Sequence, residues 1–342
     1  MLARRLGTRP GVTRHPLPSP SARSGDGPPP GGEGFPSGGE GVVVVTVAHH
    51  SGAVLPALAR DLARQDRPLT LWLVVDNSPR ASPVAADALV PAEPHTPPCP
   101  LRLLPGEEGD GFGAGCNRAL AWLDDRGWGG WVWLLNPDTA LPRGDELRRL
   151  EETLARVDPR SLVGTAVEDD SGELEASGGW FRPGLRFRSR QLAPLHAEAA
   201  EPLRLDWLSG CSLALRPSAH QPPARFDPAF PLYYEDMDLC LRLQRLGTPV
   251  LWLPEPRVQH RRGQGSGSAS PRRWRLSTVS YLRFLRRHCP GWVVGLRTLR
   301  LLAVTTLRLP LRPNRGRAVL AGVLEAWGWG GDQGEGGGAR RP

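Results

Sequence analysis

The feature that most constrains the fold is an unbroken run of β-branched residues from Val42 to Val47. A strand with one solvent-exposed face alternates apolar and polar side chains. A run without this alternation therefore indicates a strand buried on both faces of a parallel sheet. Parallel strands need a crossover between them, and the apolar residues of 54–65 recur at helical spacing. The run therefore predicts an α/β fold.

The same alternation of strand and helix continues along the chain. We expect further strands at 69–75, 101–104 and 131–135, and helices at 111–125 and 145–157. This order predicts an open sheet with right-handed crossovers. Ligands bind such sheets at the carboxyl ends of the strands, where Asp76 and Asp138 stand.

Beyond residue 160 the pattern is mixed. We expect short strands at 162–167 and within 173–187, a strand at 206–215, a helix at 236–246 and a last strand at 250–253. The chain then divides into four parts. These are a disordered tail at 1–40, an α/β domain at 41–265, a basic amphipathic helical extension at 266–325 and a Gly-rich disordered tail at 326–342.

Composition narrows the class of protein. Residues 1–40 are rich in Pro, Gly, Ser and Arg and have no apolar core, so we expect no signal peptide. No uninterrupted apolar run reaches the roughly 18 residues of a spanning helix. The five cysteines show no CxxC spacing, which favours a reducing compartment. The net charge of +8 predicts a basic surface.

Two strand ends carry candidate ligands. Asn136 and Asp138 follow a Trp-rich strand, and a carboxylate there can hold Mg²⁺ or Mn²⁺ beside a diphosphate, with phosphate and water completing the shell. A turn-forming Asn-Pro-Asp is an equally good interpretation of this motif alone. Asp76 is either a turn residue or an acceptor for a nucleotide base or ribose.

An acidic cluster, Glu235, Asp236 and Asp238, follows an aromatic-rich run at 230–234. Acids at a helix start are often solvated caps. Here apolar neighbours predict a half-buried cluster at the lip of a pocket, where the pKa of a carboxyl rises and it can act as a base. We choose Asp236 as the base. Asp238 either caps the helix or pairs with Arg242, four residues on.

Three glycines, at 111, 113 and 115, precede a helix. They suggest a phosphate cradle, although a flexible turn with an N-cap explains them equally well. Asn117, in the first helical turn, could reach a nucleotide. His260 is a lone histidine, and such residues are usually structural, but its place after the last strand keeps it open as a metal or diphosphate ligand.

The segments 274–287 and 292–312 combine Leu, Val and Trp with Arg. They are either domain-closing helices with solvated arginines or interfacial helices on an anionic membrane, which we favour. Nucleic-acid binding is the competing explanation of the basic charge, but no RNA or DNA module is recognisable, so we expect no nucleic-acid partner.

Together these motifs resemble the family 2 glycosyltransferases, especially the bacterial rhamnosyltransferase-like branch. The resemblance covers residues 42 to about 290 and rests on ordered motifs at 42–47, 74–78, 111–117, 135–138, 207–211 and 232–242. The family fold is GT-A, a Rossmann-like open sheet flanked by helices, which agrees with the α/β pattern.

The resemblance implies a metal-dependent, inverting transfer from a nucleotide-sugar, with Mg²⁺ or Mn²⁺ as cofactor. Asp236 would be the base and Glu235 would position the acceptor. The implied nucleotide-sugar contacts are Thr46, Asp76, Asn117 and Asn136; the acceptor contacts are Trp207 and Asp238; the metal ligands are Asp138 and His260.

The expected protein is a cytoplasmic enzyme, peripheral on the inner face of the plasma membrane. Its donor would be a dTDP- or UDP-sugar, with rhamnose first, and its acceptor a lipid-linked or cell-wall glycan. One alternative is a non-enzymatic basic module that binds nucleic acid or other anionic partners. Another is a nucleotidyltransferase, which would want a Gly-rich, Lys- or Arg-bearing loop where 48–53 has Ala-His-His-Ser-Gly-Ala.

Overall fold

The protein is described from a computed structural model. The described residues are 39, 41–90, 100–175, 177–184, 190–191, 201–261 and 270–328. The tails expected at 1–40 and 326–342 lie almost entirely outside these residues.

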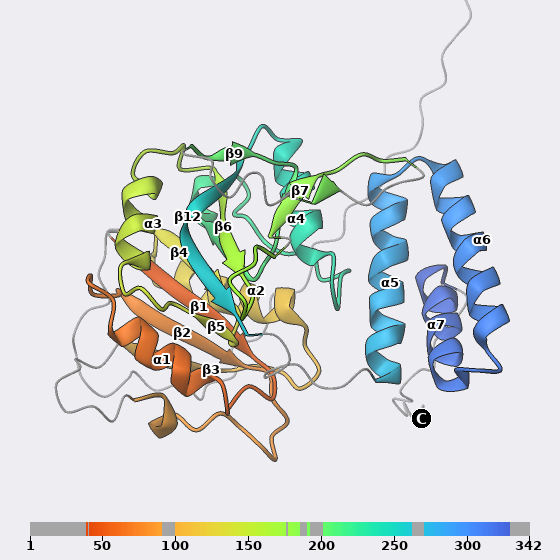
Figure 1. The fold of residues 1–342 in the computed structure, drawn as a ribbon, viewed down its shortest axis with the longest axis horizontal. Coiled ribbons are helices and arrows are strands. Elements are labelled where there is room, and N and C mark those ends of the chain that lie inside the picture. The colour runs from red at the N-terminus through yellow and green to blue at the C-terminus, as the bar shows by residue number, and fades with distance from the viewer. Residues whose placement is uncertain are drawn as a thin grey trace, which may run out of the picture. The chain divides into compact units, whose positions relative to one another are not determined.

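A nine-stranded sheet forms the centre of the fold (Figure 1). Its strands are β1 (Val42–Ala48), β2 (Leu71–Asp76), β3 (Leu101–Pro105), β4 (Trp131–Leu135), β5 (Thr139–Ala140), β6 (Leu162–Glu168), β9 (Leu203–Arg204), β11 (Ser212–Leu215) and β12 (Val250–His260). The order is β3-β2-β1-β4-β11-β6-β12-β5, and β9 pairs with β12 off this path. Strands β1 to β4 are mutually parallel, as the sequence predicts, whereas β11 runs antiparallel to β4 and β6. A small second sheet has the order β10 (Trp207–Leu208), β7 (Gly178–Trp180), β8 (Arg190–Gln191).

The β-branched run forms the central parallel strand. Every residue of β1 is buried, and β1 pairs with β2 on one side and β4 on the other. The prediction of a strand buried on both faces is therefore confirmed.

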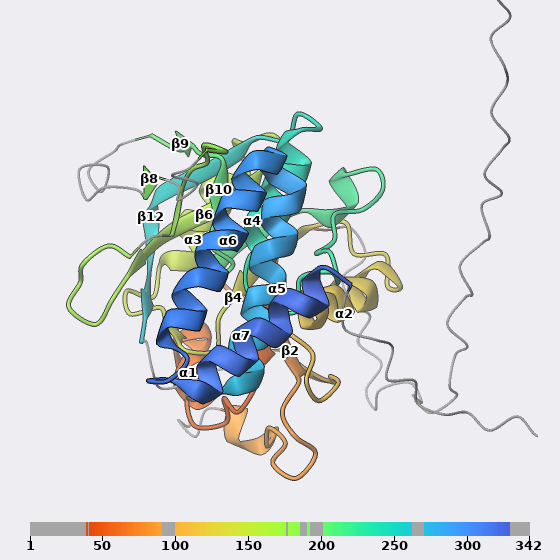
Figure 2. The same cartoon turned by 90° about the vertical axis from the view of Figure 1, so that its right-hand side faces the viewer.

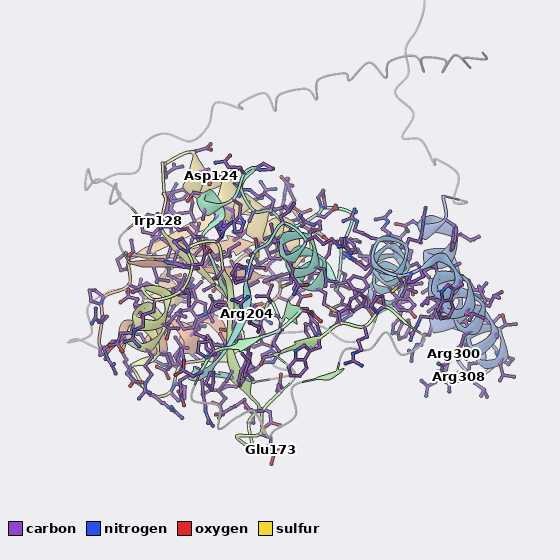
Figure 3. The ribbon with its side chains drawn as sticks, turned by 90° about the horizontal axis from the view of Figure 1, so that it is seen from above. Asp124, Trp128, Glu173, Arg204, Arg300 and Arg308 are labelled. Carbon is purple, nitrogen blue, oxygen red and sulfur yellow. The ribbon has the colours of Figure 1, made fainter. Side chains whose placement is uncertain are left out.

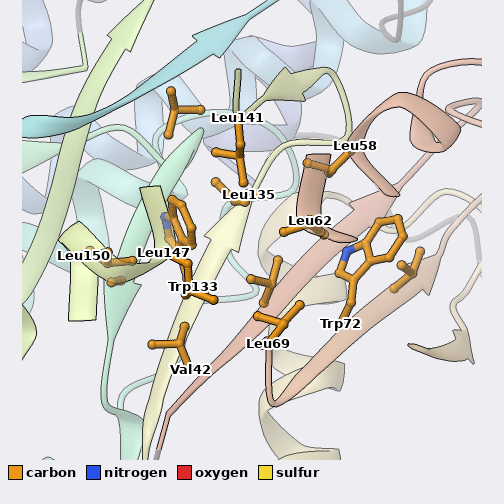
Figure 4. Close-up of a cluster of buried hydrophobic side chains, with 14 of the residues drawn as sticks. Val42, Leu58, Leu62, Leu69, Trp72, Trp133, Leu135, Leu141, Leu147 and Leu150 are labelled. Carbon is orange, nitrogen blue, oxygen red and sulfur yellow. The ribbon is translucent and has the colours of Figure 1, made fainter. Parts of the chain in front are cut away.

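Helices cover both faces of the sheet. They are α1 (Leu55–Ala63), α2 (Phe112–Asp124), α3 (Glu146–Leu154) and α4 (Glu235–Gln244), with short 3₁₀ turns η1 (Asp87–Leu89) and η3 (Pro217–Ala219). Helices α1 and α3 close one face over a core that includes Trp72 and Trp133 (Figure 4). Helix α2 packs on the other face so closely that a Cβ at Gly115 would lie 2.6 Å from a methyl group of Val47.

Three helices follow the sheet, α5 (Pro271–His288), α6 (Gly291–Arg308) and α7 (Pro313–Ala326). They lie side by side in both views (Figures 1 and 2). Their shared core includes Phe284 and Val323, and it extends to Phe230 and Leu241, so these helices also pack on the α4 segment. Among the described residues, no helix combines the length and the apolar character that crossing a membrane requires.

Two strand predictions need correction. The strand expected at 206–215 is broken by a turn at 209–211, so β10 and β11 belong to different sheets. The strand expected to end at Leu253 runs to His260, because pairing with β6 shifts between Leu253 and Arg257 and then resumes.

Candidate functional site

A cavity of about 340 Å³ opens at the carboxyl ends of β1 and β4. Three of its lining residues, Val47, His49 and Ser51, come from the end of β1 and the loop after it, and three more, 136–138, follow β4. Because β2 and β3 lie on one side of β1 and β4 lies on the other, the strand order reverses here. Open α/β sheets bind ligands at such a reversal.

Asp138 and His260 meet at this edge of the sheet. Antiparallel pairing of β5 and β12 sets His260 opposite Thr139, and Asp138 Oδ1 lies 3.2 Å from His260 Nε2. The other ring nitrogen, Nδ1, lies 3.1 Å from Glu175 Oε2. A carboxylate behind an imidazole is the usual support of a metal-binding histidine.

The contact between Asp138 and His260 favours a protonated imidazole, and a metal ion bound there would displace that proton. Burial disfavours the imidazolium form, but Asp138 and Glu175 outweigh it and raise the pKa of His260. The carboxylate side chain is 10% exposed and the imidazole 15%. No cluster of three His, Cys, Asp or Glu with metal-site geometry occurs in the described part of the chain. Asp138 and His260 could supply two ligands, and Mg²⁺ or Mn²⁺ commonly takes the rest from phosphate and water.

Asp236 lies behind the cavity wall and is tied to the Asp138 loop. Its Oδ2 accepts a hydrogen bond from the backbone N–H of Gly210 at 2.9 Å. The next residue, Cys211, accepts one through its carbonyl from the N–H of Asn136 at 3.0 Å. A single turn therefore connects the candidate base to the candidate metal ligand.

Glu235 and Asp236 share a buried environment. Burial, followed by the charge of Asp236, raises the pKa of Glu235 to about 8, and burial also raises the pKa of Asp236. Neighbouring carboxyls of this kind retain one proton between them. Asp236 accepts two backbone N–H bonds, from Gly210 and Met237, whereas Glu235 Oε2 has no partner among the described residues. We therefore place the charge on Asp236 and the proton on Glu235.

The N-terminal half of the described chain matches a known protein family. Residues 43–201 match the family described as "Glycosyl transferase family 2".

Residues 43–201 are a glycosyltransferase family 2 domain.

Individual relatives agree with this assignment. The glycosyltransferase is 27% identical, over 309 residues, to N-acetylglucosaminyl-diphospho-decaprenol L-rhamnosyltransferase of Mycobacterium tuberculosis, strains CDC 1551 and H37Rv; the match covers 80% of this chain and 95% of the relative.

One solved structure shows the same GT-A fold. A structure of GalNAc-T7 with UDP, GalNAc and Mn²⁺ superposes with a TM-score of 0.50 at 14% identity, covering 72% of this chain and 47% of that one. The glycosyltransferase thus spans about half the length of that protein. A mannosyltransferase from Pyrobaculum calidifontis, with GDP-Man and Mn²⁺, matches 84% of this chain and 86% of its own at 17% identity and a TM-score of 0.46.

Two residues expected at the nucleotide make hydrogen bonds inside the glycosyltransferase fold. Thr46 is fully buried, and its hydroxyl accepts the indole N–H of Trp72 at 3.0 Å. It lies on the sheet face covered by α1, because side chains alternate along β1. Asn117 uses both amide atoms on the backbone of Phe226, at 2.8 and 2.9 Å. Neither residue lines the cavity.

Asp76 fits its turn interpretation. Its two oxygens accept the N–H groups of Ser78 at 3.0 Å and Val84 at 2.7 Å, which organises the loop after β2. Of the expected nucleotide-sugar contacts, Asn136 alone lies at the cavity.

The acidic cluster divides differently from the expectation. Asp238 is fully buried and contacts Arg242 at 2.6 Å, Arg287 at 3.0 Å and His288 at 2.9 Å. Burial opposes its charge, but these donors lower the pKa of Asp238. The predicted pairing with Arg242 is confirmed. Both carboxylate oxygens are engaged by these donors, and the expected contact of Asp238 with the acceptor stays a prediction.

Glu235 is only 6% exposed, so it is buried rather than half-buried at a lip. A Cβ at Gly113 would lie 3.5 Å from its Cβ, which places the side chain against α2. Its expected contact with the acceptor stays a prediction. Trp207 is also buried, at 9% exposure, and its indole N–H has no partner in the described residues, so its acceptor contact stays a prediction.

The glycines before α2 allow close packing rather than form a cradle. A Cβ at Gly111 would lie 2.1 Å from the carbonyl oxygen of Pro231, and one at Gly113 would lie 3.1 Å from the side chain of Phe226. The helix can approach β1 and the α4 segment only because these side chains are absent.

Sequence reasoning missed several cavity residues. His49, Tyr233, Arg272 and Arg273 all line the cavity. The two arginines belong to the helical extension, and nothing in the local sequence indicates that α5 starts beside β1 and β4. The Tyr-Tyr pair before the acids was visible, but its left-handed backbone, with φ of 65° and 68°, was not.

Proposed function

We propose that this glycosyltransferase is an inverting, divalent-metal-dependent enzyme that moves a sugar from a dTDP- or UDP-sugar to a lipid-linked acceptor. One observation carries the proposal: the turn at 209–211 joins Asp236 to the loop whose residues Asn136 and Asp138 line the cavity. Rhamnose is the first choice of sugar because the mycobacterial relative is named as a rhamnosyltransferase acting on a decaprenol diphosphate.

The proposed chemistry is a single displacement at the anomeric carbon. Asp236 takes the proton of the acceptor hydroxyl as its oxygen attacks, and the bond to the diphosphate oxygen breaks. A metal held by Asp138 and His260 would stabilise the charge on the departing diphosphate. Glu235, uncharged beside Asp236, avoids a second negative charge next to the base.

The test is turnover of dTDP-rhamnose and UDP-sugars with a short-chain polyprenyl diphosphate acceptor that carries N-acetylglucosamine. Asp236→Asn should reduce kcat by at least about 100-fold, the usual contribution of a general base. The product should have the anomeric configuration opposite to that of the donor. Retained configuration contradicts the mechanism. Wild-type turnover in both Asp138→Asn and Asp236→Asn would show that neither carboxylate takes part in the reaction.

We also propose that α6 attaches the enzyme to an anionic membrane surface. Its outward face carries a stripe of apolar side chains, 49–80% exposed: Trp292, Leu296, Leu299 and Leu307. Arg300 and Arg308 project from the same helix (Figure 3). No acidic residue occurs between Glu255 and Glu325. A helix with an apolar face and flanking arginines suits the boundary between headgroups and acyl chains.

Vesicle co-sedimentation tests this attachment. The wild type should bind vesicles containing phosphatidylglycerol and bind pure phosphatidylcholine weakly, and Leu299→Glu with Leu307→Glu should abolish binding. Leu246→Glu is the matched control, since Leu246 is 72% exposed but follows α4. No affinity of the wild type for anionic vesicles would refute the attachment.

A further inference from the structure

Two arginines at the start of α5 complete the cavity wall. Arg272 and Arg273 line the same cavity as Asp138, although they lie far from it in sequence. Arg272 donates a hydrogen bond to the carbonyl of Gly109 at 2.7 Å, which connects α5 to the loop between β3 and α2. Arg273 donates through Nε to the hydroxyl of Tyr233 at 2.8 Å.

The acidic residues of the cavity must be balanced by positive charge before an anion can bind. Its acidic lining residues are Asp110 and Asp138, so it would repel a diphosphate if nothing balanced them. A metal at Asp138 would balance one side. The guanidinium groups of Arg272 and Arg273 are the fixed positive charges of the lining, and the planar guanidinium donates two parallel bonds to phosphate oxygens.

The segment 231–234 holds Arg273 in place. Pro231 packs against Gly111, and the N–H of Leu232 donates to the Ser280 hydroxyl at 3.3 Å. Tyr233 and Tyr234 both adopt the left-handed region, a conformation that costs about 1–3 kcal/mol per residue and persists where the surroundings enforce it. The guanidinium carbon of Arg273 also lies 5.4 Å from the centre of the Tyr233 ring.

We propose that Arg272 and Arg273 bind the diphosphate of the nucleotide-sugar donor, and that the Tyr233 hydroxyl positions Arg273 for this contact. The inference rests on the proposed function and adds residues to its donor site. A lipid-linked acceptor also carries a diphosphate. The donor is the better match because the cavity lies at the ends of β1 and β4, the usual place for a nucleotide in this sheet type.

Isothermal titration calorimetry in Mn²⁺ tests the proposal with UDP, dTDP, uridine and thymidine. Arg272→Ala with Arg273→Ala should weaken UDP or dTDP at least ten-fold and leave the nucleosides unchanged. Tyr233→Phe should weaken the same nucleotide by a smaller factor. Arg275→Ala is the matched control on the same helix, because Arg275 pairs with Glu325 at 3.3 Å and does not line the cavity. Arg273→Lys keeps the charge and serves if the alanine variant misfolds; it should also weaken the nucleotide.

The outcomes separate this inference from the proposed function. The arginine assignment alone is overturned if the double alanine variant and Arg273→Lys both bind the nucleotide with wild-type affinity while Asp138→Asn binds it more weakly. If the wild type binds neither UDP nor dTDP, both the arginine assignment and the proposed function are overturned. A parallel titration with farnesyl diphosphate separates the two diphosphate sources. If the double variant weakens only farnesyl diphosphate, the donor assignment is overturned.

Discussion

The carboxylate of Asp238 accepts a hydrogen bond from His288 Nε2 at 2.9 Å, and this contact joins the helix that carries Asp236 to the helix that carries Arg273. Both side chains are fully buried. The C-terminal helices are therefore connected to the catalytic half of the protein by a buried hydrogen bond. Any change in how α5 packs will be transmitted to α4.

Replacing Asp238 by Asn should destabilise the fold by about 3 kcal/mol, because removing one partner leaves buried basic groups without their counter-charge. Urea unfolding measures the change in the free energy of unfolding. Asp158→Asn is the control, since Asp158 pairs with Arg160 at the surface, where such pairs contribute little to stability. Equal effects of the two substitutions would show that the buried cluster adds little.

Replacing Glu235 by Gln should change how stability depends on pH. The pKa of Glu235 is about 8 in the folded protein against 4.5 for an ordinary glutamate, so only the unfolded state releases this proton between those pH values. The wild type thus loses stability as pH rises through this window, and the loss is complete above it. Between pH 4.5 and pH 8 the free energy of unfolding of the variant should rise, relative to that of the wild type, by a few kcal/mol.

Unfolding curves across this pH range measure the difference between the two proteins. A constant difference would mean that Glu235 is charged in the folded state.

Replacing Gly115 by Ala should destabilise the protein by about 1–3 kcal/mol, the usual cost of overpacking. The new methyl group would lie 2.6 and 2.8 Å from the two methyl groups of Val47, and this clash outweighs the higher helix propensity of alanine. Gly52→Ala is the control, because a Cβ there meets nothing within 4 Å. Thermal unfolding compares the two, and an unchanged Tm for Gly115→Ala would indicate that α2 can shift outward.

Replacing Asp138 by Asn, or His260 by Asn, should abolish the metal-dependent part of nucleotide binding. A ligand that binds only the folded state raises its Tm, so UDP or dTDP with Mn²⁺ should stabilise the wild type more than either component alone. Both variants should lose this added stabilisation, as should the wild type in EDTA. Asp124→Asn, on the outer end of α2, is a control that should retain it. Equal nucleotide shifts with and without metal would refute the metal role.

The sequence predicts the fold better than it predicts the site. The run at 42–47 and the strand–helix alternation after it constrain backbone and burial together, so the parallel half of the sheet follows. The site depends on which face each side chain takes. Thr46 lies one residue before cavity-lining Val47, and in a strand this single step reverses the direction of the side chain.

Distant packing explains the other omissions. Asn117 has the right residue type at the start of a helix, but the backbone of Phe226 occupies its amide. Arg272 reaches the cavity only because α5 packs beside the β3–α2 loop, a contact across more than a hundred residues that no local pattern encodes. Asp138, His260 and Asp236 could be proposed from the sequence because strand ends and helix starts are recognisable there.

The irregularity in β12 has a consequence for how the chain tolerates changes in length. Leu253 pairs with Thr165, and Arg257 pairs with the next residue of β6. Residues 254–256 therefore form a bulge, called here the excursion, that has no pairing partners in β6. An insertion or deletion within the excursion can leave the later register unchanged, and with it the alignment of His260 beside Thr139. The position of His260 is thus independent of small changes in chain length a few residues upstream.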